Sequence, residues 1–185
     1  MVSAVRRARL IRALDCFSVN GGNILISADR LTDLAQTRLD YWNGLIGFMR
    51  QRNSSITFNN PNSKHQLRAR ADSFGSGEFI LVALAIVKPD PLIGVGLEIS
   101  GPKEYYAALA DDGSKIQSEI DSVCGEKQKL QWNPETKVRD IWLYRQVDFS
   151  ERRRWVEQHE WLCERLEAFR KVLKPRVVEL LHAAS

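Results

Sequence analysis

The sequence has few of the features that would place a protein in a specialised class. Its cysteines, Cys16, Cys124 and Cys163, are far apart and lack the spacing of metal ligands. That usage indicates a reducing cytoplasm and argues against a structural zinc site. The longest apolar run, Phe79 to Val87, is much shorter than the roughly 20 residues that span a bilayer. No central apolar block of a secretory signal is visible near the N-terminus. We therefore expect a cytoplasmic protein without a membrane partner.

Catalytic signatures are equally scarce. The histidines, His65, His159 and His182, accompany no recognisable nucleophile motif, and there is no Gly-x-Ser-x-Gly elbow. Gly94 and Gly96 fall inside a strand-like run and do not form a phosphate-binding loop. His159 lies on the apolar side of a predicted helix, where a partly buried core histidine is expected. We expect no complete catalytic constellation, no cofactor and no resident metal, which favours a protein that is not an enzyme.

The net charge is only mildly basic. The chain has 27 Lys and Arg residues against 23 Asp and Glu residues, which gives +4 at pH 7. This balance permits nucleic-acid binding without requiring it. Arginines concentrate near the start, at positions 6, 7, 9 and 12, and residues 1–27 are predicted to form a basic N-terminal arm or linker. Residues 28–182 are predicted to form a single domain, large enough to bury about 70% of its unfolded surface.

Hydrophobic periodicity predicts the secondary structure. Helix-like spacing covers 28–52, 103–123 and the run after Glu151, and strand-like runs cover 65–71, 79–87, 93–99, 130–132 and 138–146. Ser27 is the expected N-cap of the first helix, and Asp148 with Glu151 forms a capping-box pattern before the last one. The run Asp111-Asp112-Gly113 is expected to bend or split the middle helix. Pro175 is expected to kink or end the last helix near Lys174.

The order of elements, α-β-β-β-α-β-β-α, predicts an α+β domain. We expect a mostly antiparallel sheet of about five strands with helices packed against it. The order also matches the helix–three strands–helix–strand core of restriction-endonuclease-like nucleases, which hold a metal ion with carboxylates and use a nearby lysine. Asp90 and Glu98 mimic that pattern, but Ser100 stands where the lysine is needed. A degenerate metal nuclease that uses Asp90 and Glu98, with Mg²⁺ as its cofactor, is therefore an alternative interpretation.

Two groups of cations are the better indication of a function. One group surrounds a polar loop, and the other stands at the start of the last predicted helix. The residues are Arg50, Arg52, Lys64, Arg68, Arg70, Arg152, Arg153 and Arg154. Arg68 and Arg70 share one face of a predicted strand. Three cations in the first turn of a helix oppose its dipole, so contact with phosphate groups would explain them. Such runs are also typical of solvated helix faces. We expect these eight residues to contact the backbone of DNA or RNA.

The last predicted helix suggests a different alternative. Its apolar stripe, at steps of three or four residues, consists of Trp155, His159, Leu162, Leu166, Phe169, Leu173 and Val177. Trp161 falls off this stripe. An exposed Trp161 would mark a partner-binding surface, and the chain would then be a protein-interaction or homodimerisation module that uses its last helix.

Several segments resemble a known family. They are Arg38–Trp42, Ile93–Ile99, Ile141–Arg145, Trp155–Leu162 and Leu166–Arg176. From about Asp33 to Val177 the chain resembles an uncharacterised prokaryotic family, the domain of unknown function family 4268, and the Trp-x-x-x-His-Glu-Trp-Leu block is the most specific part. Members of this family often lie C-terminal to a restriction-endonuclease-like nuclease domain. The resemblance implies a prokaryotic defence or nucleic-acid-handling system and a nuclease-like protein partner, but it carries over no catalytic residues.

Together these observations predict a non-enzymatic accessory domain of the cytoplasm. We expect it to bind nucleic acid, or a protein that acts on nucleic acid.

Overall fold

A computed structural model describes residues 24–136 and 138–184, with side chains from residue 33 onward. Its elements are, in chain order, α1 (Ile24–Gln51), β1 (Gln66–Arg68), the 3₁₀ turn η1 (Ala71–Ser73), β2 (Phe79–Ile86), β3 (Leu92–Ile99), α2 (Lys103–Asp111), α3 (Gly113–Cys124), β4 (Gln131–Asn133), β5 (Arg139–Gln146), the 3₁₀ turn η2 (Arg152–Arg154) and α4 (Trp155–Ala183). Of the predicted basic arm, residues 1–23 lie outside the described part and 24–27 belong to α1. None of the described helices is both long and apolar enough to cross a membrane.

The strands form one sheet in the order β1-β2-β3-β5-β4, and every pairing is antiparallel. The α+β fold with a mostly antiparallel sheet is therefore confirmed, and the sheet is plainly antiparallel rather than mixed. The central strands β2, β3 and β5 have eight residues each, whereas the edge strands β1 and β4 have three. Short edge strands limit pairing with other chains.

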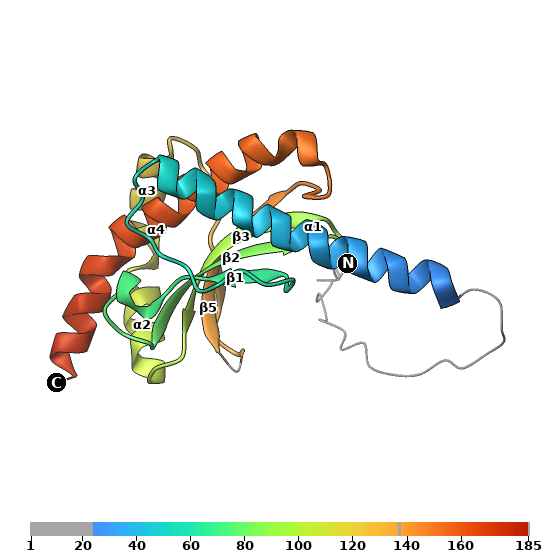
Figure 1. Cartoon of the computed structure of the whole chain (residues 1–185). Helices are drawn as coiled ribbons and strands as arrows, with labels where there is room; N and C mark the ends of the chain where they lie inside the picture. Colours follow the sequence, from blue (N-terminus) through green and yellow to red (C-terminus); the bar gives the residue numbers. More distant parts are fainter. Residues whose placement is uncertain (1–23, 137, 185) are drawn as a thin grey trace, which may run out of the picture.

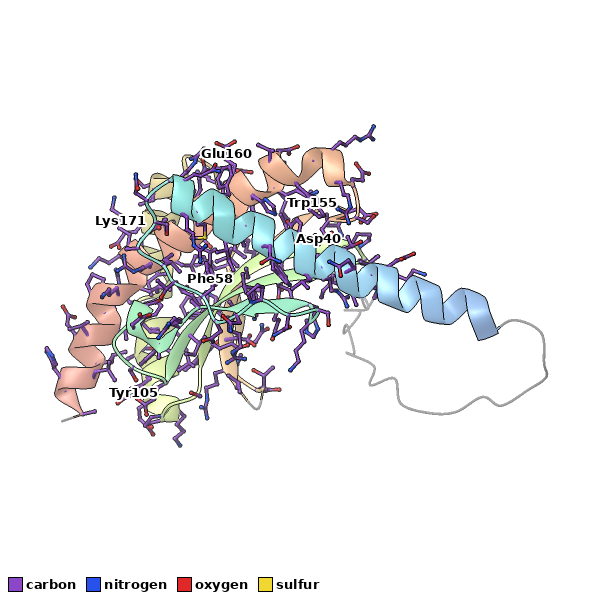
Figure 2. All side chains as sticks on the ribbon, viewed as in Figure 1. Asp40, Phe58, Tyr105, Trp155, Glu160 and Lys171 are labelled. Atoms are coloured by element: carbon purple, nitrogen blue, oxygen red, sulfur yellow. The ribbon has the colours of Figure 1, made fainter. Side chains whose placement is uncertain are left out.

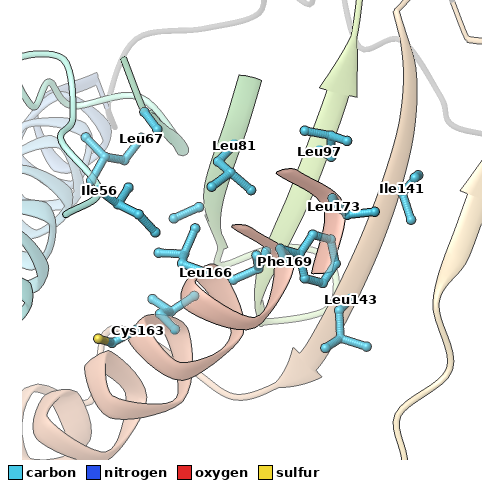
Figure 3. Close-up of a cluster of buried hydrophobic side chains, with 14 of the residues drawn as sticks. Ile56, Leu67, Leu81, Leu97, Ile141, Leu143, Cys163, Leu166, Phe169 and Leu173 are labelled. Carbon is cyan, nitrogen blue, oxygen red and sulfur yellow. The ribbon is translucent and has the colours of Figure 1, made fainter. Parts of the chain in front are cut away.

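The two long helices stand on one side of the sheet (Figure 1). α4 packs across β2 and β3, and α1 packs on α4. Figure 3 shows Leu81, Leu97 and Ile141 of the strands facing Leu166 and Phe169 of α4. Burying an apolar side chain of this size contributes roughly 1.5–3 kcal/mol. This layer of strand and helix side chains is the main core.

The opposite side of the sheet, which we call the outer face, carries a second apolar cluster. Val82 and Trp142 are buried there, and every side chain of the cluster comes from β2, β3 or β5. A Cβ at Gly94 would lie 2.7 Å from the Tyr144 ring, and one at Gly96 would lie 2.5 Å from the Trp142 ring. The two rings stack with centroids 5.5 Å apart. The strand glycines therefore make room for an aromatic pair.

Two of the predicted helix starts are wrong. α1 begins at Ile24, so Ser27 lies inside the helix and is not its N-cap. The Asp148 carboxylate accepts the backbone N–H of Ser150 at 2.8 Å, which forms a local turn instead of a helix cap. α4 begins only at Trp155, after η2. The predicted split of the middle helix is confirmed, because α2 ends at Asp111 and α3 follows as a separate helix.

Pro175 does not end the last helix, which continues to Ala183. The guanidinium of the next residue, Arg176, donates to the carboxylates of Asp112 at 2.7 Å and Glu119 at 2.9 Å. These contacts fix this part of α4 against α3. A proline removes one backbone hydrogen bond from a helix interior, and here tertiary contacts outweigh that loss.

His159 of α4 is a buried core residue, as its place on the apolar stripe predicted. Its ring centroid lies 4.6 Å from that of Tyr41 and 6.0 Å from that of Trp155. A Cβ at Gly44 of α1 would meet the His159 Cε1 atom at 2.7 Å, whereas nothing lies within 4 Å of a Cβ at Gly47. The absence of a side chain at Gly44 therefore lets the His159 ring pack directly on α1.

The two glycines of α1 give a matched pair of substitutions. We expect Gly44→Ala to lower the free energy of unfolding by about 1–3 kcal/mol, because the new methyl group displaces a buried ring. Gly47→Ala should raise it by up to about 1 kcal/mol, because alanine is the better helix former and the space is open. Urea unfolding of both variants measures the difference, and changes of the same sign would contradict this packing.

Candidate nucleic-acid interface

The region around β1 has a strong local excess of positive charge. Residues 41–71 contain Arg50, Arg52, Lys64, Arg68 and Arg70, and no aspartate or glutamate. This segment covers the second part of α1, the following loop and β1 itself. Any acidic neighbour must therefore come from elsewhere in the fold.

The chain leaves α1 through a residue with left-handed backbone geometry. Asn53 has φ 55°, a conformation that asparagine tolerates better than most residues. The backbone N–H of Ser54 then donates to the Met49 carbonyl at 3.0 Å, which satisfies an acceptor at the helix end. Arg50 lies in the last turn of α1 and is exposed.

The loop after α1 is held against β1 by backbone contacts. Phe58 forms an isolated antiparallel bridge with Ala69, and Figure 2 shows Phe58 next to the sheet, below α1 in this view. The N–H of Arg70 donates to the Thr57 carbonyl at 2.8 Å. These bonds place Arg70 beside the loop, opposite the last turns of α1.

α1, the loop and Arg70 surround a hollow of about 330 Å³, which we call the Arg50–Arg70 hollow. Its lining combines apolar, amide, hydroxyl and guanidinium side chains. The lining residues are Ile46, Met49, Arg50, Ser54, Ile56, Thr57, Phe58, Asn59, Asn60, Pro61 and Arg70.

Some of the polar side chains at the hollow already have partners. The Ser54 hydroxyl donates to the Glu167 carboxylate, and the Thr57 hydroxyl donates to Asp72 at 3.1 Å. Four other side chains have no hydrogen bond or ion pair with any described residue. They are Arg50, Asn59, Asn60 and Arg70. The lining of the hollow therefore includes two arginines and two asparagines whose side chains have no partner in the described part of the chain.

The remaining cations of this region differ in their pairing. Arg52 forms an ion pair with Glu160, and Arg68 forms one with Glu98 on the outer face. Arg68 is therefore paired, whereas Arg70 has no side-chain partner among the described residues. Lys64 is exposed and has no side-chain partner among the described residues. The Arg52–Glu160 pair is exposed and contributes about 1 kcal/mol or less, whereas Glu98 is buried. Both pairs reduce the charge that Arg52 and Arg68 offer to a ligand.

The second predicted group lies apart from the hollow. Arg152, Arg153 and Arg154 form η2 rather than the first turn of a helix. Arg152 donates to Asp40 of α1 at 2.8 Å, and Arg154 lies 3.3 Å from Glu157. Asp40 stands ten residues before Arg50 of the hollow, which is about 15 Å along α1. The structure therefore does not bring the two groups into one site.

Asp90 and Glu98 are not placed to share a metal ion. Asp90 lies in the exposed turn between β2 and β3, and Glu98 lies near the other end of β3, roughly 20 Å or more away. Burial raises the pKa of Glu98, its partner Arg68 opposes that shift, and Asp140 reinforces it. In the described part of the chain no three His, Cys, Asp or Glu residues could hold a metal ion together.

Trp161 is not an exposed anchor for a partner. Its side chain is 4% exposed, and the Arg165 guanidinium lies 5.2 Å above its ring. α4 packs against α1, α3 and the sheet, so more of its surface is buried than the apolar stripe predicted. Among the side chains described, only Val123 and Val156 are large, apolar and exposed. The last helix thus lacks the aromatic surface on which the interaction hypothesis depended.

Phe58, Asn59 and Asn60 were not predicted as site residues, because the sequence around them is typical of an exposed polar loop. One signal was available. Residues 56–59 alternate apolar and polar side chains, which is typical of an extended segment beside a sheet. That pattern would have placed this loop along β1.

Comparison with known proteins assigns the chain to a family. The family model described as "Domain of unknown function (DUF4268)" matches residues 37–177. No curated protein and no solved structure matches the chain. The matched range runs from α1 into α4 and includes every residue that lines the Arg50–Arg70 hollow. Because the match covers well over half of the sequence, the chain belongs to the DUF4268 family.

Proposed function

We propose that this domain binds DNA or RNA through the Arg50–Arg70 hollow, with Lys64 as a further contact. The observation that carries the proposal is the unpaired state of the two arginines. They line one hollow from two separate segments of the chain and have no carboxylate partner among the described residues, whereas Arg52 and Arg152 each have one.

Phosphate is the anion that best fits this arrangement. A guanidinium group donates parallel N–H bonds that match two phosphate oxygens. Arg50 also offsets the negative end of the α1 dipole, which would otherwise repel an anion. Segment 41–71 has no acidic residue of its own, so its five lysine and arginine residues outnumber the two carboxylates, Glu167 and Asp72, that contact the lining of the hollow. Phosphate contacts carry no sequence information, so we expect little sequence preference from them.

In this proposal the domain is an accessory module rather than a catalyst. It would hold nucleic acid for a nuclease-like partner, in the prokaryotic defence or nucleic-acid-handling setting that the family resemblance implies. The Asp90 and Glu98 alternative has less support, because the two carboxylates stand near opposite ends of β3.

The test is binding of labelled single- and double-stranded DNA and RNA at about 50 mM and about 200 mM salt, with and without Mg²⁺. Phosphate contacts from Arg50, Lys64 and Arg70 predict that affinity for a single strand falls roughly 20-fold between these salt concentrations. We expect the strands to stay intact. Weak binding that does not respond to salt would overturn the proposal, and Mg²⁺-dependent cleavage would favour the nuclease alternative.

A further inference from the structure

The shape and lining of the hollow indicate a more specific ligand than a nucleic-acid backbone. We propose that the Arg50–Arg70 hollow seats one nucleotide of a single strand, with its phosphate between the two arginines and its base against the apolar wall. This inference rests on the proposed function and names the substrate class of the same site.

The size of the hollow suits one nucleotide. Its volume of about 330 Å³ is at the lower end of the range of roughly 300–1,000 Å³ for small-ligand sites. The bases of a duplex are paired inside the helix, so a duplex can offer this hollow only its phosphates. A single strand can insert a phosphate and its unpaired base together. The combination of cations and an apolar wall therefore selects for an unpaired strand.

The apolar wall can take the flat face of a base. Phe58 lines the hollow together with Ile46 and Met49, and its ring is partly buried against the main core. The bridge between Phe58 and Ala69 fixes the backbone at this position. The ring is thus held in place before a ligand arrives, and stacking on an aromatic ring tolerates every base.

The free amides can serve the edge of the base or the sugar. Asn59 and Asn60 are exposed, line the hollow and have no partner among the described residues. Each amide offers both a donor and an acceptor, so it can pair with different base edges. The nearby Ser54 and Thr57 hydroxyls are occupied by Glu167 and Asp72, which leaves the amides as the adaptable groups.

The test compares a labelled single strand with a duplex of the same sequence, bound to the full chain at about 50 mM salt. We expect the single strand to bind at least about 10-fold more tightly. Phe58→Leu keeps the apolar bulk but removes the ring, and should weaken single-strand binding roughly 10-fold while leaving duplex binding unchanged. Replacing Asn59 and Asn60 by alanine should cost roughly 3-fold. Gln51→Ala, an exposed α1 residue outside the hollow, is the control and should cost less than about 2-fold.

The possible results distinguish the single-nucleotide site from the more general binding of a nucleic-acid backbone. The single strand and the duplex could bind equally, with an affinity that Phe58→Leu leaves unchanged but that replacement of Arg50 and Arg70 abolishes. This result would overturn the single-nucleotide site and leave the proposal of backbone binding intact. No binding of either nucleic acid would overturn both. Thermal unfolding of Phe58→Leu shows whether that variant is folded. The exposed Asn59 and Asn60 pair gives an independent answer if it is not.

Discussion

Replacing Arg50 and Arg70 together by glutamine should weaken single-strand binding roughly 30-fold or more at about 50 mM salt. Each arginine contributes a charge-assisted contact to phosphate, and losing two such contacts at about 1 kcal/mol each gives a factor of this size. The slope of log affinity against log salt should also become shallower by about 1.4, because two counterion-releasing contacts are gone. Fluorescence anisotropy at several salt concentrations measures both quantities.

The control removes the same charge from a place outside the hollow. Arg153 and Arg154 stand in η2 beside Glu151 and Glu157, so replacing them by glutamine should reduce affinity by less than about 3-fold. Equal losses in the two double variants would mean that binding follows net charge alone. The hollow would then have no special part in it.

The fold should lose stability in acid because of His159. This side chain is 5% exposed, and burial lowers its pKa from 6.5 to about 4, against the opposing effect of a hydrogen bond to the Tyr41 backbone. The unfolded chain takes up the proton at higher pH than the folded one, so stability is complete above about pH 6.5 and falls as the pH drops toward 4. Between pH 7.5 and about pH 4.5 we expect a loss of about 2 to 3 kcal/mol from this residue.

Urea unfolding at the two pH values, for the wild type and His159→Phe, isolates this contribution. Phenylalanine keeps a ring between Tyr41 and Trp155 but has no proton to bind. The variant should therefore lose about 2 to 3 kcal/mol less than the wild type over the same pH interval. Equal losses would show that other groups, such as the carboxylates of the surface ion pairs, cause the acid sensitivity.

Local signals in the sequence predicted most of the fold. The apolar run of β2, the strand β3 that follows it and the break between α2 and α3 are encoded in a few adjacent residues, and all are confirmed. The wrong boundaries have a different cause. Asp148 matches a capping pattern but satisfies a nearer N–H, and Pro175 is tolerated because Arg176 is tied to α3. Neither competing bond is visible in a local pattern.

The candidate site could be predicted only in part. The sequence indicates that Arg50 and Arg70 are basic and lie near a loop, but not that they line one hollow. Nor can it show that Arg52 is paired with Glu160, 108 residues away along the chain. Pairing depends on the crossing of α1 over α4, which is set by the core. The exposure of Trp161 could not be predicted for the same reason, because α4 is covered by more elements than its apolar stripe indicates.

The most direct test of the central claim is photo-cross-linking of the full chain to a single strand that carries 5-bromouracil, followed by mass spectrometry of the linked peptide. If the hollow is the binding site, the cross-link should map to the loop of residues 54–61, with Phe58 as the expected partner. The yield should fall when Arg50 and Arg70 are replaced by glutamine. A cross-link at Tyr144 of the outer face, insensitive to those two arginines, would contradict the assignment of the hollow as the nucleic-acid site.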